Sequence, residues 1–183
     1  MALTSDELTR LENLESGVAE NFLRDARAEG YSIYDMKDGF GDTFANENGV
    51  DTATSTNETY DASGDFYTNS GLNMSLVSES ESVSGAFTPP STAPTNARMV
   101  ILHKPVDSVT LNTDAVLSVS RDGGTTFTAF TLTKVADHTD GRETLTTEDM
   151  DISGQPSGTD MIWKFETFNS KEQQLHDVTL QWR

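Results

Sequence analysis

Apolar residues in the first thirty positions recur at steps of three and four, which is the spacing of one face of an α-helix. The apolar stripe consists of Leu8, Leu11, Leu14, Val18 and Phe22. Charged and polar residues occupy most of the positions between them. We therefore predict an amphipathic helix over residues 1–30, with Gly30 as its C-cap.

The pattern changes to short β-strands in the second half of the chain. From residue 97 onward, apolar and polar residues alternate in runs that are separated by turn residues, with no helical period between them. The predicted strands cover residues 98–103, 106–111, 115–120, 126–134, 161–166 and 178–182, with weaker ones at 72–77 and 83–87. Residues 31–70 show neither period, and we expect them to be irregular. The predicted fold is mainly β, with an N-terminal helical segment followed by an antiparallel, jelly-roll-like β-sandwich over residues 31–183.

A single amphipathic helix attached to a β-domain needs something to cover its apolar stripe. Other copies of the chain and a partner protein are the two candidates for that cover. We therefore predict that Leu8, Leu11, Leu14, Val18 and Phe22 form an oligomerisation or attachment interface. The spacing resembles a coiled-coil heptad but spans fewer than three repeats.

The charge of the chain narrows its possible partners. Thirty Asp and Glu against twelve Lys and Arg give a formal net charge of -18, which repels the phosphates of nucleic acids. We therefore expect no nucleic-acid partner. No run of residues is long and apolar enough to span a bilayer, so we expect no membrane insertion. The first residues lack the pattern of a signal peptide, and we expect synthesis in the cytoplasm.

One short segment matches a known local sequence motif. Residues 120–127, Ser-Arg-Asp-Gly-Gly-Thr-Thr-Phe, resemble the Asp-box, a hairpin turn found repeatedly in sialidase propellers and singly in other β-proteins. The resemblance implies a structural turn built on Ser120, Asp122, Gly124 and Phe127. Because a propeller needs several copies and this chain has one, we do not expect sialidase activity.

Candidate catalytic and metal-binding residues are sparse. His103, His138 and His176 lie far apart, and no nucleophile elbow or P-loop occurs. We expect no enzyme activity and no cofactor, with a two-carboxylate glycan hydrolase as the remaining enzymatic alternative. Asp and Asn side chains could bind Ca²⁺, but without an EF-hand loop they are better explained as caps of loop turns. The residues concerned are Asp51, Asn57, Asp61 and Asp65.

Aromatic residues gather in the stretch expected to be irregular. They are Tyr31, Tyr34, Phe40, Phe44, Tyr60, Phe66 and Tyr67. Such rings can form a sugar-stacking surface, which would make the chain a carbohydrate-binding module for a host surface glycan. The alternative that we favour is that the rings pin a long loop onto the sandwich.

Two stretches resemble virion structural proteins of tailed bacteriophages. Residues 3–17, Leu-Thr-Ser-Asp-Glu-Leu-Thr-Arg-Leu-Glu-Asn-Leu-Glu-Ser-Gly, resemble a segment common in tail-fibre proteins. Residues 38–67, with 106–111 and 151–159, resemble β-sandwich modules of such proteins. The resemblance implies a virion component of tail-fibre, head-fibre or decoration type. It also implies a homotrimer that contacts other virion proteins and that ends up in the virion.

Overall fold

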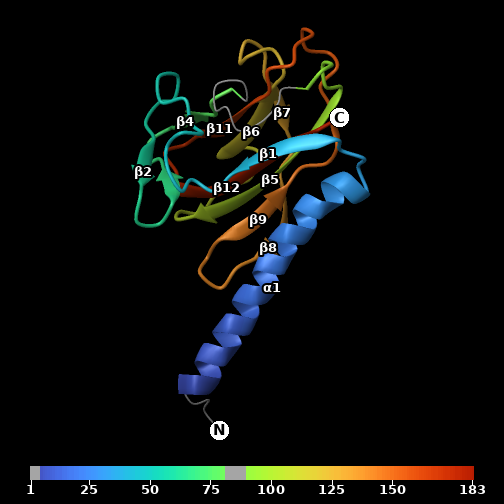
Figure 1. Ribbon diagram of the computed structural model, residues 1–183. Helices are drawn as coiled ribbons and strands as arrows, with labels where there is room; N and C mark the ends of the chain where they lie inside the picture. Colours follow the sequence, from blue (N-terminus) through green and yellow to red (C-terminus); the bar gives the residue numbers. More distant parts are fainter. Residues whose placement is uncertain (1–4, 81–89) are drawn as a thin grey trace.

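The computed structural model describes residues 5–80 and 90–183, and, within the helix, the side chains of residues 17, 18 and 21–32. One helix is followed by two antiparallel sheets that pack face to face as a sandwich (Figure 1). The predicted fold class is therefore confirmed.

The helix, α1, spans Ser5–Ser32 without interruption and crosses one outer face of the sandwich (Figure 1). The prediction that Gly30 ends it is wrong, because α1 continues two residues further. Gly30 instead lies against β12, where a Cβ atom would stand 1.9 Å from Oε1 of Gln181. A side chain at position 30 would therefore displace the Gln181 amide. The chain leaves the helix through Asp35, which has a positive φ of 55°.

The larger sheet has eight strands and carries the helix. Its strands run in the order β2-β3-β12-β5-β9-β8, while β1 also pairs with β12 and β10 with β5. Their bounds are Asp38–Asp42 (β1), Thr59–Asp61 (β2), Phe66–Thr68 (β3), Asn96–Pro105 (β5), Thr133–Asp137 (β8), Glu143–Thr146 (β9), Met150–Asp151 (β10) and Gln173–Trp182 (β12).

The smaller sheet has four strands in the order β4-β11-β6-β7. They are Ser75–Val77 (β4), Ala115–Ser120 (β6), Thr128–Phe130 (β7) and Ile162–Thr167 (β11). The two inner faces form one apolar core, in which Trp163 of β11 and Trp182 of β12 are almost completely buried. β5 is buried on both faces, because the core covers one face and α1 the other.

Several predicted strands differ from those observed. Residues 106–111 form no strand, because the backbone N–H of Thr110 is held by the Asp114 side chain at 2.8 Å in a local turn. The run 126–134 is divided between β7 and β8, which belong to different sheets. The segment expected to be irregular contains β1, β2 and β3, and β9 was missed. The predicted strand at 83–87 lies outside the described residues.

Candidate assembly site

The C-terminal half of α1 is packed on the larger sheet of its own chain. Leu23 and Ala26 are buried against Val100 and Leu102 of β5. Because these four side chains form only a small apolar cluster, polar contacts contribute much of the attachment.

Arg98 of β5 is the centre of those polar contacts. It is 1% exposed, and its Nη1 donates to the backbone carbonyl of Ala26 at 2.5 Å, while Nη2 lies 3.2 Å from Oε2 of Glu29. The guanidinium also lies 5.0 Å from the centre of the Tyr34 ring, a cation–π distance. Burial lowers the pKa of Arg98, and the charge of Glu29 opposes that shift. No local pattern indicated this role, since Arg98 is the first residue of the predicted apolar strand 98–103.

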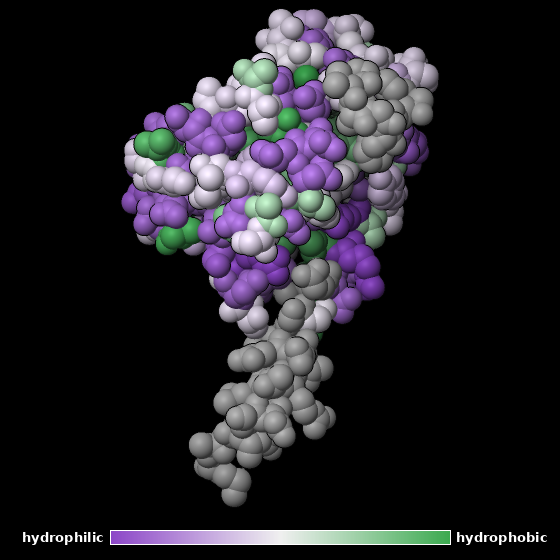
Figure 2. Space-filling view, turned by 60° about the vertical axis from the view of Figure 1, so that its left-hand side comes forward, coloured by the Kyte–Doolittle hydropathy of each residue, from purple (hydrophilic) through white to green (hydrophobic). Residues whose placement is uncertain are grey.

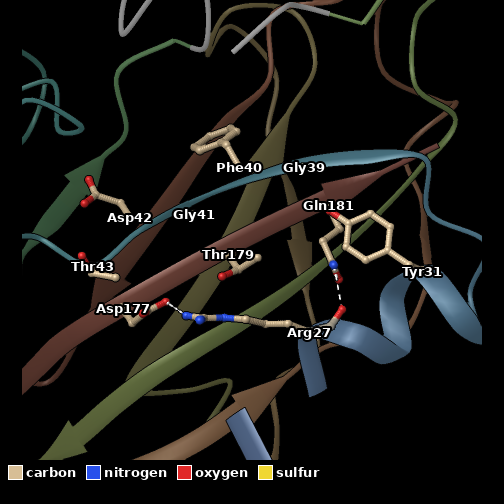
Figure 3. Close-up of a pocket in the computed structure, with 10 residues that line it drawn as sticks. All are labelled: Arg27, Tyr31, Gly39, Phe40, Gly41, Asp42, Thr43, Asp177, Thr179 and Gln181. Carbon is tan, nitrogen blue, oxygen red and sulfur yellow. Dashed lines mark hydrogen bonds and ion pairs between the residues drawn. The ribbon is translucent and has the colours of Figure 1, made fainter. Parts of the chain in front are cut away.

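Two residues of β12 complete the attachment. The amide of Gln181 donates to the backbone carbonyl of Arg27 at 2.8 Å, and the Arg27 guanidinium forms an ion pair with Asp177 (Figure 3). Helix and sheet are thus joined through helix carbonyl groups as well as side chains, which sets the direction of α1 relative to the sandwich.

The predicted apolar stripe borders the attached face of α1, since Phe22 lies one helical turn before Ala26. Val18 and Phe22 are 53% and 50% exposed. Since consecutive helical residues point about 100° apart, Phe22 lies roughly a quarter turn from its buried neighbour Leu23. The other predicted members, Leu8, Leu11 and Leu14, lie on α1 but outside the described side chains. In Figure 1 the N-terminal half of α1 extends beyond the sandwich.

A test of the attachment is the substitution Arg98→Met, which we expect to lower the free energy of unfolding by about 2 kcal/mol because the buried hydrogen bond to the Ala26 carbonyl and the contact with Glu29 are both lost. Hydrogen exchange should rise selectively in residues 21–32, as measured by mass spectrometry. Arg24→Met is the matched control, because the Arg24 side chain is 74% exposed and its variant should behave as the parent protein. Equal protection of residues 21–32 in the Arg98→Met variant and the parent would contradict the proposed attachment.

An open trough of about 330 Å³ lies between α1 and β1, with β12 as its floor (Figure 3). Arg27 and Tyr31 border it on the helix side, and Gly39 and Gly41 border it on the β1 side. Phe40 and Asp42 also line the trough, although their side chains alternate with these glycines and point to the other face of β1.

The Asp-box-like segment forms a hydrogen-bonded turn between β6 and β7. The N–H of Gly124 donates to Oγ of Ser120 at 2.9 Å, and the N–H of Thr126 donates to Oδ1 of Asp122 at 2.8 Å. Gly124 has a φ of 81°, which a residue with a Cβ atom rarely adopts. Burial alone would raise the pKa of Asp122, but the hydrogen bonds from Ser120 and Thr126 outweigh it and lower the pKa.

The aromatic residues of the predicted irregular segment are largely engaged in packing. Phe44 and Tyr67 are fully buried with ring centres 5.2 Å apart, and Tyr60 donates its hydroxyl to the Phe44 carbonyl at 2.7 Å. Tyr31, by contrast, is 51% exposed. Tyr60 is therefore a poor candidate for the sugar-stacking residue.

The candidate Ca²⁺ ligands cap turns of their own loops. Asp51 accepts from the N–H of Ala53 at 3.0 Å, and Asp61 accepts from the N–H of Ser63 at 2.8 Å. Asn57 and Asp65 have positive φ angles of 58° and 51°, as turn residues often do. Within residues 5–80 and 90–183, no three His, Asp or Glu side chains are grouped so that they could hold a metal ion.

Each of the three histidines has its own hydrogen-bond partners. His103 is fully buried between Oε1 of Glu143, 3.0 Å from Nδ1, and Oε1 of Gln173, 2.9 Å from Nε2. Burial alone would raise the pKa of Glu143, but the contact with His103 outweighs it and lowers the pKa. Burial lowers the pKa of His176 to about 4. His138 bonds to Thr144.

Comparison with known proteins adds no family assignment: no protein-family model matches the chain, and no curated protein matches it significantly. In the part of the chain that the structure describes, no helix has the length and apolar character needed to cross a membrane.

Proposed function

We propose that this protein is a structural component of a bacteriophage virion, of fibre, spike or decoration type, which assembles through α1. The observation that carries the proposal is the division of α1 into two parts. Its C-terminal half is attached to the sandwich, whereas Val18 and Phe22 remain exposed on a helix that continues past the sandwich (Figure 1).

The N-terminal half of α1 needs apolar contacts to be stable as a helix. An isolated helix of this length is marginal in water, because most helix stability in proteins comes from packing of an apolar face. Leu8, Leu11 and Leu14 continue the stripe of Val18 and Phe22 toward the N-terminus. A second copy carries the same stripe at the same spacing, so association of parallel helices covers every stripe at once. We propose three copies as the assembled state.

The sandwich is suited to be the displayed body of such an assembly. On the side seen in Figure 2, hydrophobic residues are confined to small spots among hydrophilic ones. Together with the net charge of -18, this surface favours solubility when many copies are held close together.

The assembly proposal is tested by Phe22→Asp, because a carboxylate cannot be buried unpaired in a helix interface. Sedimentation equilibrium should give about 60 kDa for the parent protein, three times the chain mass of 20.0 kDa, and the chain mass for the variant. Leu72→Asp is the control, since Leu72 is 52% exposed on the sandwich and should leave the mass unchanged. A Phe22→Asp variant with the mass of the parent would contradict the proposal.

A truncation gives a second measurement. Deleting residues 1–16 removes the extension but keeps the attached half, whereas deleting residues 1–30 would also uncover Val100 and Leu102. The shorter deletion should therefore yield a folded monomer. The virion assignment itself is tested by labelling purified phage particles with antibodies against the recombinant chain, and unlabelled particles would contradict it.

A further inference from the structure

The trough beside α1 continues past the residues drawn in Figure 3. A second hollow of about 350 Å³ shares Arg27, Thr43 and Asp177 with it and reaches Arg142 and His176. The two hollows lie next to each other along α1, meet at the Arg27–Asp177 ion pair and are both bordered by β12; together they are called the groove. Their volumes are in the range of sites for small organic ligands.

Hydroxyl groups line this groove without being used by the protein. The hydroxyls of Tyr31, Thr43 and Thr179 make no hydrogen bond to any of residues 5–80 and 90–183. Each hydroxyl can both donate and accept. Three unused hydroxyls from α1, β12 and the residue after β1 therefore converge on one surface, which fits a ligand that is itself rich in hydroxyls.

Both arginines of the groove already have carboxylate partners, and Asp42 and Asp65 add further negative charge. Arg27 is paired with Asp177, and Arg142, which is paired with Asp140, faces the same hollow as Asp65. His176 is neutral at pH 7, because its pKa is lowered to about 4. A strongly anionic ligand would meet Asp65 and Asp177 within a chain of net charge -18, and a cationic one would meet the two arginines. Because both arginines are already paired and carboxylates are in excess, the groove disfavours an anionic ligand, and its unused hydroxyls favour an uncharged one.

The shape of the groove depends on β1 and on Tyr31. Gly39 and Gly41 face it and add no side chains, so the space above Thr179 stays open; a Cβ atom at Gly41 would lie 3.1 Å from the Thr179 hydroxyl. The Tyr31 ring, half exposed, stands at the rim above Gln181 (Figure 3). An aromatic ring beside hydroxyls offers both an apolar face and hydrogen bonds.

We propose that this groove binds a neutral oligosaccharide, with its C–H face on Tyr31 and its hydroxyls bonded to Thr43, Thr179 and Tyr31. The site is independent of the assembly proposal, because Arg27 and Tyr31 lie on the opposite flank of α1 from Val18 and Phe22. Helix association therefore leaves the groove open.

The experiment is titration of the full chain with neutral hexasaccharides, followed by calorimetry and by saturation-transfer NMR. Cellohexaose, laminarihexaose, maltohexaose, mannohexaose and chitohexaose are the probes, with hexagalacturonate as the acidic counterpart. We expect at least one neutral probe to bind with Kd below about 1 mM and hexagalacturonate to bind more weakly. Binding of hexagalacturonate alone, or of none of the probes, would overturn the proposal.

Substitutions of groove residues test whether the oligosaccharide binds in the groove. The double variant Tyr31→Phe with Thr179→Val removes two hydroxyls at nearly constant volume, and we expect about tenfold weaker binding. Thr133→Val is the matched control, because Thr133 is an exposed strand residue of β8 outside the groove. Equal affinity in both variants would overturn the assigned site. Sedimentation of the double variant should give the mass of the parent, so that failure of this site and failure of assembly are distinguished.

Discussion

Replacement of Trp163 by Ala is expected to lower the free energy of unfolding by about 4 kcal/mol, because it removes one of the two tryptophan side chains from the core of the sandwich. Trp163 is fully buried on β11, and its ring centre lies 6.2 Å from that of Phe44. β11 is flanked by β4 and β6 on both sides, so the backbone has little freedom to collapse into the space left by the ring. Lost transfer free energy and a residual cavity therefore both contribute.

Urea denaturation followed by circular dichroism measures this effect, with an unchanged m-value showing that the same unfolding transition is compared. Trp163→Phe should cost distinctly less than Trp163→Ala, because it keeps most of the buried surface. Phe168→Ala serves as a control, since Phe168 is 38% exposed and leaves no closed cavity. A loss below about 1.5 kcal/mol for Trp163→Ala would show that the core relaxes around this position.

Replacement of Arg121 by Ala is expected to be similarly severe, at about 4 kcal/mol, because several buried carbonyl groups would lose their donor together. Arg121 is 6% exposed and follows Ser120 at the end of β6. Its guanidinium donates to the backbone carbonyls of Pro94, Ser153, Gln155 and Pro156 at 2.5–3.1 Å. Arg121 thereby joins the loop before β5 to the loop after β10.

The geometry of arginine makes a specific comparison possible. Five N–H donors in a fixed plane reach four carbonyls at once, whereas an ammonium group is a single point of charge. Arg121→Lys should therefore recover only part of the loss, and Arg24→Ala, at an exposed position, should cost almost nothing. Thermal unfolding of the three variants provides the measurement. If Arg121→Lys were as stable as the parent protein, the positive charge would matter here and not the planar set of N–H donors.

The structural role of Arg121 could not be predicted from the motif that contains it. The Asp-box resemblance drew attention to Ser120, Asp122, Gly124 and Phe127, whose turn contacts are local in sequence. The residue between the first two of them makes contacts that are 27 to 35 residues distant. Nothing in the local pattern of residues 120–127 distinguishes a cation that organises remote loops from one exposed to solvent.

The strand predictions succeeded and failed for a related reason. Ala115–Ser120 was predicted with its observed bounds, because a buried strand bounded by turn residues has a distinct local signature. β1 has the sequence Asp-Gly-Phe-Gly-Asp, which has low intrinsic strand preference. It is a strand because its backbone pairs with β12 from Asp38 to Asp42. That partner lies about 140 residues away in the chain, so no local window contains it.

The sequence by itself determined the class of fold and the helical stripe. The helical period of 3.6 residues and the strand period of 2 can both be recognised from the spacing of apolar residues close together in the chain. Only the tertiary structure decided that half of α1 is attached to the sandwich while Val18 and Phe22 stay exposed. It also decided that Arg98 holds the helix and that a groove opens between α1 and β1. Those features depend on side chains and carbonyl groups brought together from opposite ends of the chain. The free energy of such contacts cannot be read from the spacing of neighbouring residues.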